Sequence, residues 1–368
     1  MSTADLPAAS ISSAPPVMRT GVFGWLRENL FNTWYNALLT LLGAYLLYSV
    51  VAGFVSWGLV NAVWSGSASA CQTLEGRGAC WAVIAEKHRF ILFGRYNYEE
   101  QWRPLAMMLL FIGLVGVSAF RRFWGPLLAV AWAVGLVAMA VLMLGGVLGM
   151  PYVTTENWGG LPLTLILSVS ACVFAFPLGV VLALGRRSHL PAVRSACVAY
   201  IEFIRGVPLI TVLFMASIMF PLLLPPGMNF NKLLRVEIGL ILFAAAYLAE
   251  VVRGGLQAVP KGQYEAADSL GLSYVQKTGF IVLPQALRIV IPALVNTFIG
   301  TFKDTTLVII VGLFDLLNAA KTALQDPEWR TFYWEVYLFI ALIYFGFCFF
   351  MSKYSQNLEA RLRRGVHR

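Results

Sequence analysis

Charged residues are scarce in this chain of 368 residues: Asp, Glu, Lys and Arg together make up 12% of it, whereas soluble domains average about 25%. Hydrophobic residues make up 59%, and so few charges could not cover that much apolar surface in water. Composition therefore excludes a soluble enzyme, a disordered chain and a disulfide scaffold, and it indicates a protein dissolved in a lipid bilayer. The net charge of +9 then reflects Lys and Arg in cytoplasmic loops, and we expect no nucleic-acid partner.

Sequence motifs for chemistry are also missing. The three histidines, His88, His189 and His367, are scattered and form no metal-binding spacing. No Gly-Lys pair occurs, so there is no Walker A phosphate loop, and neither a nucleophile elbow nor a zinc-protease motif is present. We therefore expect no catalytic residue, no metal and no cofactor in this chain. Residues 1–35 lack an apolar stretch followed by a cleavage site, so we expect no signal peptide.

Cysteine is scarce too, with five residues in the whole chain. Cys172, Cys197 and Cys348 lie in or beside apolar stretches, where cysteine acts as a small hydrophobic residue. Cys71 and Cys80 share one long loop, and an oxidising compartment would let them form a disulfide. Two free thiols are the alternative.

What the chain does contain is a series of eight apolar stretches, each about 17–25 residues long and able to cross roughly 30 Å of hydrocarbon as a helix. They lie at 38–60, 105–120, 126–149, 161–184, 198–224, 237–253, 288–314 and 332–351. We therefore predict an all-α integral membrane protein with about eight transmembrane helices.

The distribution of Lys and Arg predicts the orientation of these spans. If the N-terminus is inside, most cations fall in inside segments, and most of those outside lie in the long loop 61–104, where the rule is weak. Both termini are therefore predicted to be cytoplasmic. This orientation gives a cytoplasmic arm at 1–35, followed by three accessory helices at 36–150 with 61–104 as a long periplasmic loop.

One inside loop has mixed polar and helical character. Glu265–Leu270 favours a helix that Gly271 would end, and a second short helix could run from Ser273 to Leu283 before Pro284 interrupts it. We predict two short helices that project into the cytoplasm. Small Ala266 and Ala267 would let a partner approach closely, and Glu265 would offer it one charge.

The spacing in this loop resembles the EAA loop of ABC-importer permeases. The pattern is Glu-Ala-Ala, three residues, Gly, nine residues, Ile, one residue and Leu-Pro, and it is met at Glu265, Ala266, Ala267, Gly271, Ile281, Leu283 and Pro284. Helix propensity explains Glu-Ala-Ala but not Gly271 or Leu283-Pro284. At ordinary residue frequencies, chance would produce all seven matches on the order of 10⁻⁵ times in such a chain.

Three further segments resemble the polar-amino-acid branch of these importers, the histidine/glutamine type. They are Phe203–Pro208, Glu250–Gly255 and Phe302–Leu307, with Val207 and Thr306 standing where the family more often has Thr and Ser. The three added N-terminal spans and the long external loop resemble the M-type permease of the general L-amino-acid importer of Gram-negative bacteria.

This resemblance implies a five-helix type I importer core at 151–355, with a cytoplasmic coupling loop at 254–286 and a basic cytoplasmic tail at 356–368. It implies a non-catalytic permease subunit in the bacterial inner membrane that moves L-amino acids from periplasm to cytoplasm. A separate dimer of ATP-binding subunits would hydrolyse ATP and dock on the Glu265–Pro284 loop. The other implied partners are a periplasmic amino-acid-binding protein and a second permease, as a heterodimer rather than a homodimer.

The alternative function is a secondary transporter or channel for small polar solutes, without an ATPase. Such a transporter should show inverted repeats between its halves, and the first three spans do not mirror the last five.

Ionisable residues at membrane depth are costly and therefore suggest function. Glu202 and Arg205, like Glu250 and Arg253, follow a Glu-x-x-Arg pattern whose i, i+3 spacing lets each pair bond on one helix face. Each pair either neutralises itself near the cytoplasmic interface, with Arg reaching the headgroups, or lines the substrate path.

Two more features fall within predicted spans. Gly206-Val-Pro208 predicts a break in the fifth span, which serves either helix packing or, through the new helix start after Pro208, attraction of a substrate carboxylate. Lys303 and Asp304 point about 100° apart, so each needs its own partner on another helix, a sister subunit or the substrate. An amino acid carries both complementary charges. The pair is therefore a candidate for the substrate path, and otherwise it fixes helix packing.

Overall fold

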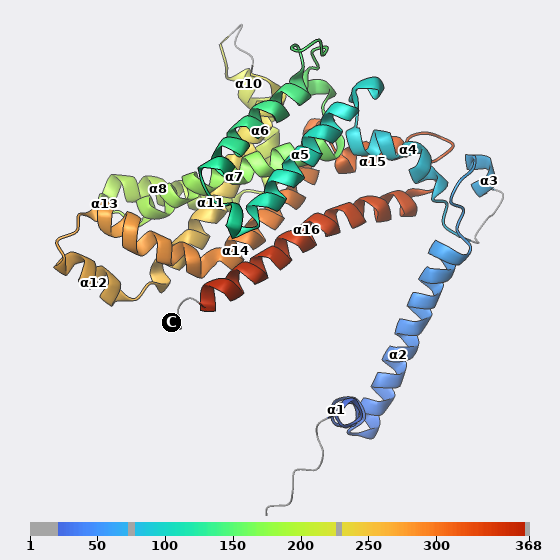
Figure 1. Ribbon diagram of the computed structural model, residues 1–368, viewed down its shortest axis with the longest axis horizontal. Helices are drawn as coiled ribbons and strands as arrows, with labels where there is room; N and C mark the ends of the chain where they lie inside the picture. The colour runs from blue at the N-terminus through green and yellow to red at the C-terminus, as the bar shows by residue number, and fades with distance from the viewer. Residues whose placement is uncertain (1–20, 73–77, 226–229, 365–368) are drawn as a thin grey trace, which may run out of the picture. The chain divides into compact units, whose positions relative to one another are not determined.

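The computed structural model describes residues 21–72, 78–225 and 230–364. The predicted arm and basic tail therefore lie partly outside the described residues. The regular elements of the described chain are helices, apart from a two-residue strand, β1 (Phe314–Asp315), which pairs with Gly159 and Gly160. This agrees with the all-α prediction (Figure 1). Two compact units form: Met1–Gly66 with Ala70–Cys80, and Ser67–Ser69 with Trp81–Arg368.

The first unit contains one long apolar helix. After α1 (Val22–Asn29), α2 (Trp34–Val55) continues through a π-helical turn at Ser56–Val60, and together they make a 27-residue candidate span. No residue of α2 is buried, as expected for a helix whose surroundings are lipid.

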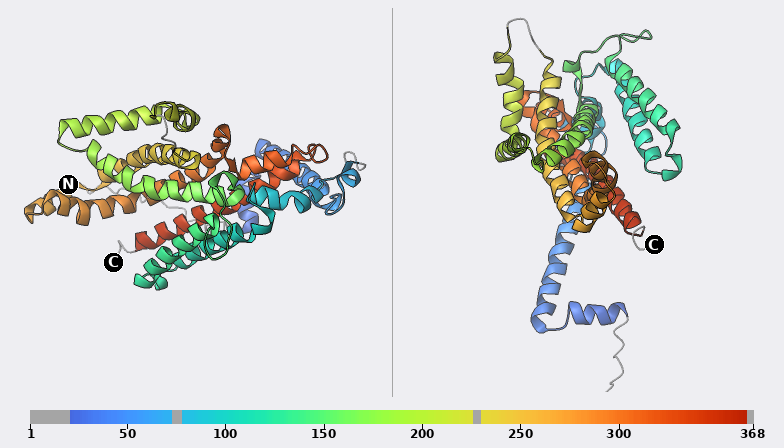
Figure 2. Two further views of the ribbon diagram at one scale, coloured as in Figure 1. Left: turned by 90° about the horizontal axis from the view of Figure 1, so that it is seen from above. Right: turned by 90° about the vertical axis from the view of Figure 1, so that its left-hand side faces the viewer.

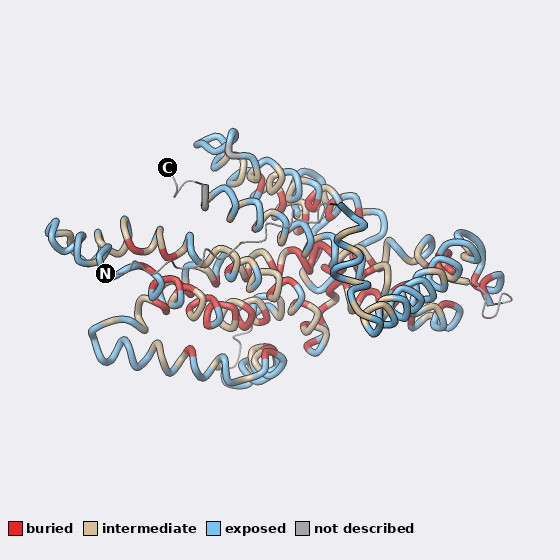
Figure 3. Tube along the Cα trace, turned by 90° about the horizontal axis from the view of Figure 1, so that it is seen from below, coloured by how far each residue is buried: buried red, intermediate tan, exposed pale blue. Residues whose placement is uncertain are grey.

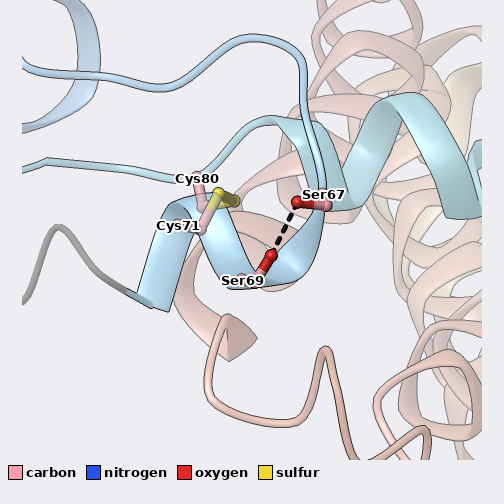
Figure 4. The surroundings of a disulfide bond; sticks show 4 residues. All are labelled: Ser67, Ser69, Cys71 and Cys80. Atoms are coloured by element: carbon pink, nitrogen blue, oxygen red, sulfur yellow. Dashed lines mark hydrogen bonds between the residues drawn. A yellow bond between two sulfur atoms is a disulfide. The ribbon is translucent and has the colours of Figure 1, made fainter.

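A disulfide closes the end of the first unit. Cys71 and Cys80 are bonded, with their Cα atoms 5.8 Å apart, and Figure 4 shows Cys71 on the short helix α3 (Ala68–Gln72). Val63 pairs with Cys80 in a β-bridge, and Ala79 N donates to Trp57 O. Of the two alternatives for these cysteines, the structure has the bonded pair.

The second unit holds all the remaining helices. They are α4 (Ala82–Phe93), α5 (Trp102–Ser118), α6 (Pro126–Leu144), α7 (Gly160–Arg186), α8 (Pro191–Gly206), α9 (Leu209–Phe214), α10 (Phe220–Leu222), α11 (Lys232–Ala258), α12 (Lys261–Ser269), α13 (Tyr274–Gln276), α14 (Leu283–Asp304), α15 (Leu316–Ala323) and α16 (Tyr333–Arg364). Helix α4 lies in the loop 61–104, where no helix was predicted. Since α5 and α6 share this unit with the predicted core, residue 150 is not a boundary between compact units.

Six of the described helices are long and apolar enough to cross a membrane, and a seventh if one bent pair counts as a single span. Helix α11 covers the predicted span 237–253 but is not among these candidates. It carries Glu237, Glu250 and Arg253 in its length. The prediction of eight spans is therefore not confirmed as a count.

Two predicted spans have a different form in the structure. The stretch 198–224 is not one helix: α8 and the helix beginning at Leu209 meet at 103°, at the break predicted for Gly206–Pro208. The stretch 288–314 begins earlier, because the chain stays helical from Tyr274 to Val311. A π-helical turn at Lys277–Val282 leads directly into α14. Pro284 therefore lies directly after the π-helical turn and does not interrupt the helix.

The core of the second unit consists of α7, α11 and α14, which pack on one another and supply most of its buried hydrophobic residues. Small residues bring these helices close together. A Cβ added at Gly179 would lie 2.8 Å from Leu248 Cβ, and one added at Gly255 would lie 2.6 Å from Ala286 O. Helices inside membranes associate through such small residues, because lipid offers no hydrophobic driving force between them. Figure 3 shows the buried positions gathered in the middle of the bundle.

Candidate functional site

The loop 254–286 lies at one end of the second unit. Figure 1 and the left view of Figure 2 place α12 and α13 at that end, and α4 and α15 at the opposite end. Gly271 ends α12 as the sequence predicts: its φ is +71°, and the amide of Leu272 donates to Ala267 O. A left-handed residue at this point favours glycine.

A second cap follows at once. Ser273 and Gln276 form a capping box, in which each side chain binds the other residue's backbone N–H. The Lys277 amine lies 2.6 Å from an Asp268 carboxylate oxygen and ties the two helical segments together. The loop is therefore a defined helix, turn and helix.

Contacts with the bundle hold this loop in place. Tyr264 donates its hydroxyl proton to Leu256 O at 2.9 Å, and Arg187 Nη1 donates to the same carbonyl at 2.8 Å and to Tyr264 Oη at 3.2 Å. Gln285 of α14 donates to Gln263 Oε1 at 3.0 Å. The end of α7, the end of α11 and the start of α14 therefore all connect to α12, so that a displacement of α12 would reach three core helices.

The outer face of the loop is apolar and exposed. Leu270, Val275 and Phe280 are each more than three-quarters exposed, and Tyr274 is more than half exposed. Glu265 and Ala266 are exposed as well. We call these six residues the docking face.

Three of the other residues of the predicted motif, Ala267, Ile281 and Leu283, pack at least partly against the protein itself. Ala267 is buried, because α12 packs against the π-helical turn Lys277–Val282. This corrects the expectation that Ala267 would admit a partner. Ile281 and Leu283 are half-buried, and Pro284 is exposed. The motif thus divides into residues that present a surface and residues that support it.

The predicted charge pairs join into one network across three helices. Glu250 Oε2 lies 2.8 Å from Arg253 Nη2, as the i, i+3 spacing predicts. Its Oε1 lies 2.9 Å from Arg186 Nη1, and Arg205 Nη1 lies 3.8 Å from Oε2. Glu202 pairs with Arg186 at 2.8 Å rather than with Arg205, which lies 5.5 Å from the centre of the Tyr247 ring. Arg186 therefore links α7 to both α8 and α11.

A cavity of about 500 Å³ lies beside the α8–α9 break. Leu209 lines it directly after the break, with Phe243 and Tyr247 of α11 and Thr297 and Asp304 of α14. Pro208 is the N-cap of α9, so the new helix start predicted at Pro208 adjoins this cavity. Neither Glu-x-x-Arg pair lines it.

Lys303 and Asp304 separate, as their 100° offset predicts. Asp304 is half-buried and faces the cavity, whereas Lys303 is exposed and does not line it. Asp304 therefore remains a candidate for contact with a substrate, and Lys303 does not share that cavity.

Sequence reasoning missed three residues that organise this end of the molecule: Arg186, Arg187 and Tyr264. In the sequence, Arg186 and Arg187 at the end of the fourth span indicate only the orientation of that span. The two Glu-x-x-Arg patterns that follow offer carboxylate partners for them, but nothing in the sequence shows that α7 packs next to α8 and α11. Among the described residues no cluster of His, Cys, Asp and Glu could hold a metal.

Comparison with known proteins identifies one family and several similar proteins. Residues 175–364 match the family described as "Binding-protein-dependent transport system inner membrane component". The chain is 49% identical over 349 residues to the inner membrane amino-acid ABC transporter permease protein YhdY of Escherichia coli (strain K12), covering 93% of each chain. It is 41% identical over 415 residues to the glutamate/glutamine/aspartate/asparagine transport system permease protein BztC of Rhodobacter capsulatus, covering 95% of each. A solved structure described as an amino acid ABC transporter with histidines is 33% identical, covering 55% of this chain and 92% of that one, with a TM-score of 0.49.

Proposed function

This chain belongs to the inner-membrane components of binding-protein-dependent transport systems, and from that membership we propose that it moves L-amino acids from the periplasm into the cytoplasm. It is a transport subunit and not an enzyme, and it works with an ATPase and a solute-binding protein. One observation carries the substrate class: two amino-acid permeases are 49% and 41% identical to it over more than nine-tenths of its length. A secondary transporter without an ATPase is not favoured.

The ATPase docks on the docking face. A cluster of exposed apolar side chains on a cytoplasmic loop would be characteristic of a surface that a partner covers, and these belong to a loop with two helix caps and several bonds to the core. Glu265 supplies the one charge of that face. Motion of the ATPase would reach α7, α11 and α14 through Tyr264, Arg187 and Gln285.

The docking face lies in the cytoplasm, where ATP is, and both chain termini lie on that side of the bacterial inner membrane. The distribution of Lys and Arg supports this orientation. Cysteine labelling tests this orientation. A membrane-impermeant maleimide should label Gln325→Cys in intact cells, but should label Gln276→Cys only after the cells are permeabilised. Both positions are exposed. Labelling of Gln276→Cys from outside would reverse the orientation.

The substrate passes through the cavity beside the α8–α9 break. Its Asp304 carboxylate would receive the substrate ammonium group, and the new helix start after Pro208 would favour the substrate carboxylate. The network around Glu250 lies outside this cavity, and its two carboxylates are paired with arginines of the same network, so we assign it to structure rather than to the path.

A second permease completes the channel, and we propose a heterodimer. The layout of three accessory spans before the core supports this, because it resembles the M-type permease of the general L-amino-acid importer. When the tagged chain is purified from solubilised membranes, an ATPase and a second permease of different sequence should accompany it. The second permease should be present in the same molar amount as the tagged chain. Recovery of only this permease with the ATPase would indicate a homodimer.

The transport test uses the reconstituted complex in proteoliposomes. Radiolabelled L-amino acids should accumulate only with ATP on the ATPase side and the solute-binding protein on the other side. Accumulation driven by an ion gradient without ATP would contradict the proposal.

Asp304→Asn tests the path, with Lys303→Met as the matched control one residue away. Asp304→Asn should reduce substrate-stimulated ATP hydrolysis about tenfold or more, since a bond to a charged group contributes about 1.5–3 kcal/mol, without loss of subunits from the complex. Lys303→Met should leave stimulation unchanged. Loss of assembly in Asp304→Asn, with normal stimulation in the remaining complex, would make Asp304 structural.

A further inference from the structure

A second cavity, of about 210 Å³, lies at the opposite end of the same unit, away from Asp304. Arg95, Trp158, Lys232 and Phe314 line it, together with Glu156 and Gly312. These residues come from the segment after α4, the segment before α7, the start of α11 and the turn before α15. The cavity therefore forms where the accessory segment meets the core, and no motif predicts it.

Three hydrogen-bond donors line this cavity, and none has an acceptor within hydrogen-bond distance among the described residues. The Arg95 guanidinium stacks 3.7 Å from the centre of the Phe314 ring, which leaves its edge free. The Lys232 amine lies against the backbone of Gly312, 3.2 Å from where a Cβ would stand. Trp158 is 8% exposed, and its indole Nε1–H is buried without a partner.

An unpaired buried donor is costly, because it has given up water without gaining another acceptor. Of the three, the Trp158 indole N–H is the buried one, whereas Arg95 is exposed and Lys232 is half-buried. A buried donor beside two unpaired cations in one cavity is best explained by an acceptor that enters it. The space excludes a large ligand but admits a small planar anion or the end of an acidic side chain.

The electrostatics of the cavity favour a negative ligand. Burial lowers the pKa of Lys232, and the positive charges of Arg235 and Arg95 lower it further, against one opposing carboxylate, Glu156. The cavity also adjoins the start of α11, a helix of 27 residues whose N-terminal end carries positive partial charge. Cations outnumber the single carboxylate, so an anion would relieve their mutual repulsion.

We propose that this cavity is a carboxylate-binding site, in which Arg95, Lys232 and Trp158 donate to the two carboxylate oxygens. A guanidinium edge matches a carboxylate in geometry, and bonds between charged groups are the strong ones. The carboxylate comes either from a free amino acid or from an acidic side chain of the solute-binding protein. The site is separate from the proposed substrate path, and its occupancy does not depend on transport.

The test follows Trp158 in the purified complex labelled with 5-fluorotryptophan. Its fluorine resonance among the 11 tryptophans is identified by its absence in Trp158→Phe. Titration with sodium acetate, exchanged against sodium chloride at constant ionic strength, should shift that resonance saturably. Arg95→Met and Lys232→Met should each weaken acetate binding about tenfold or more, whereas Lys232→Arg should retain it.

The control is Arg330→Met, which removes an exposed cation from the loop after α15 and should leave acetate binding unchanged. If the methionine variants fail to assemble, the wild-type titration and Lys232→Arg still decide. No saturable shift with acetate, or the same shift in Lys232→Met, would overturn the proposal.

A competition then identifies the natural source of the carboxylate, and either result supports the site. Displacement of acetate by a free L-amino acid assigns the site to substrate. Displacement by the purified solute-binding protein, but not by free amino acids, assigns it to an acidic side chain of that protein.

Discussion

At the end of the second unit that carries α12 and α13, large apolar side chains lie exposed around a helix of nine residues. At the end that carries α4 and α15, the backbone itself is tightly interlocked. A Cβ on Gly94 would lie 2.7 Å from Gly159 Cα, and Asp315 is fully buried, where its carboxylate accepts from the amides of Leu317 and Asn318.

The difference shows how one chain combines a partner surface with a rigid frame. At the α4–α15 end, backbone segments pack directly on one another and the Asp315 carboxylate is bonded within the chain. The α12 end leaves apolar area that only a partner can cover. Changes at the α4–α15 end should therefore affect folding. Changes at the α12 end should affect coupling to the ATPase before they affect folding.

The largest effect is expected for Gly160→Val. Gly160 has φ +65°, and a Cβ there would overlap the carbonyl of Leu92. Strain and overlap together should remove about 4 kcal/mol or more of stability. Yield and thermal unfolding of the purified complex measure this loss. Gly113→Val is the control, because a Cβ at Gly113 meets no atom within 4 Å. Normal stability of Gly160→Val would contradict the interlocked frame.

An intermediate effect is expected for Glu250→Gln. The change removes the charge that Arg186, Arg205 and Arg253 share, and the side chain is only 15% exposed. Breaking a buried pair costs about 3–5 kcal/mol, and partial exposure should reduce this to about 2. Glu202→Gln removes one exposed pair and should cost less than about 1 kcal/mol. Equal melting temperatures for the two variants would show that the shared network does not act as a unit.

A smaller change in stability, but a large one in function, is expected for Gly271→Val. A Cβ at Gly271 meets nothing within 4 Å, so the cost is backbone strain of about 1–2 kcal/mol. The turn that sets the docking face should shift, and substrate-stimulated ATP hydrolysis should fall at least about tenfold. Gly262→Ala, in the same loop with an ordinary φ, is the control. Unimpaired transport by Gly271→Val would remove the basis of the coupling assignment.

The smallest effect is expected for Asp326→Asn. Its hydrogen bond with Lys87 holds the pKa of Asp326 below its ordinary value. A lowered carboxyl pKa stabilises the fold above the unfolded value, about 3.9, and that contribution is lost as the pH falls through the folded value. Burial lowers the pKa of Lys87, but the bond to Asp326 more than offsets it, so its contribution persists up to about pH 10. The melting temperature of Asp326→Asn should therefore be slightly lower than wild type at pH 7, and the difference should shrink as the pH falls below about 3.9. A difference that does not shrink on acidification would exclude the ion pair as its cause.

Six of the predicted spans, the break at Gly206–Pro208, the Gly271 cap and the pairing of Cys71 with Cys80 were predictable, because each rests on local spacing or on shared membership of one loop. The Glu250–Arg253 pair was predictable for the same reason. The count of eight spans is not confirmed. The partner of Glu202 was not, because Arg186 reaches it from another helix. Ala267 was misjudged because its burial depends on the π-helical turn packed against α12. Helix α4 was missed because its residues are not apolar enough to stand out as a span.

From the sequence alone follow the solvent of the protein, its helical class and the loop pattern that resembles a known importer family. Hydropathy and local spacing carry that information, because the bilayer forces the backbone of each span to satisfy its own hydrogen bonds. Only the tertiary structure decided which charges share Glu250, which face of α12 is left uncovered, and that Asp304 rather than Lys303 borders the cavity. The tertiary structure also brought Arg95, Trp158 and Lys232 together around the second cavity. Those outcomes depend on how helices distant in sequence pack, and small residues such as Gly179 and Gly255 set that packing through contacts that no local pattern records.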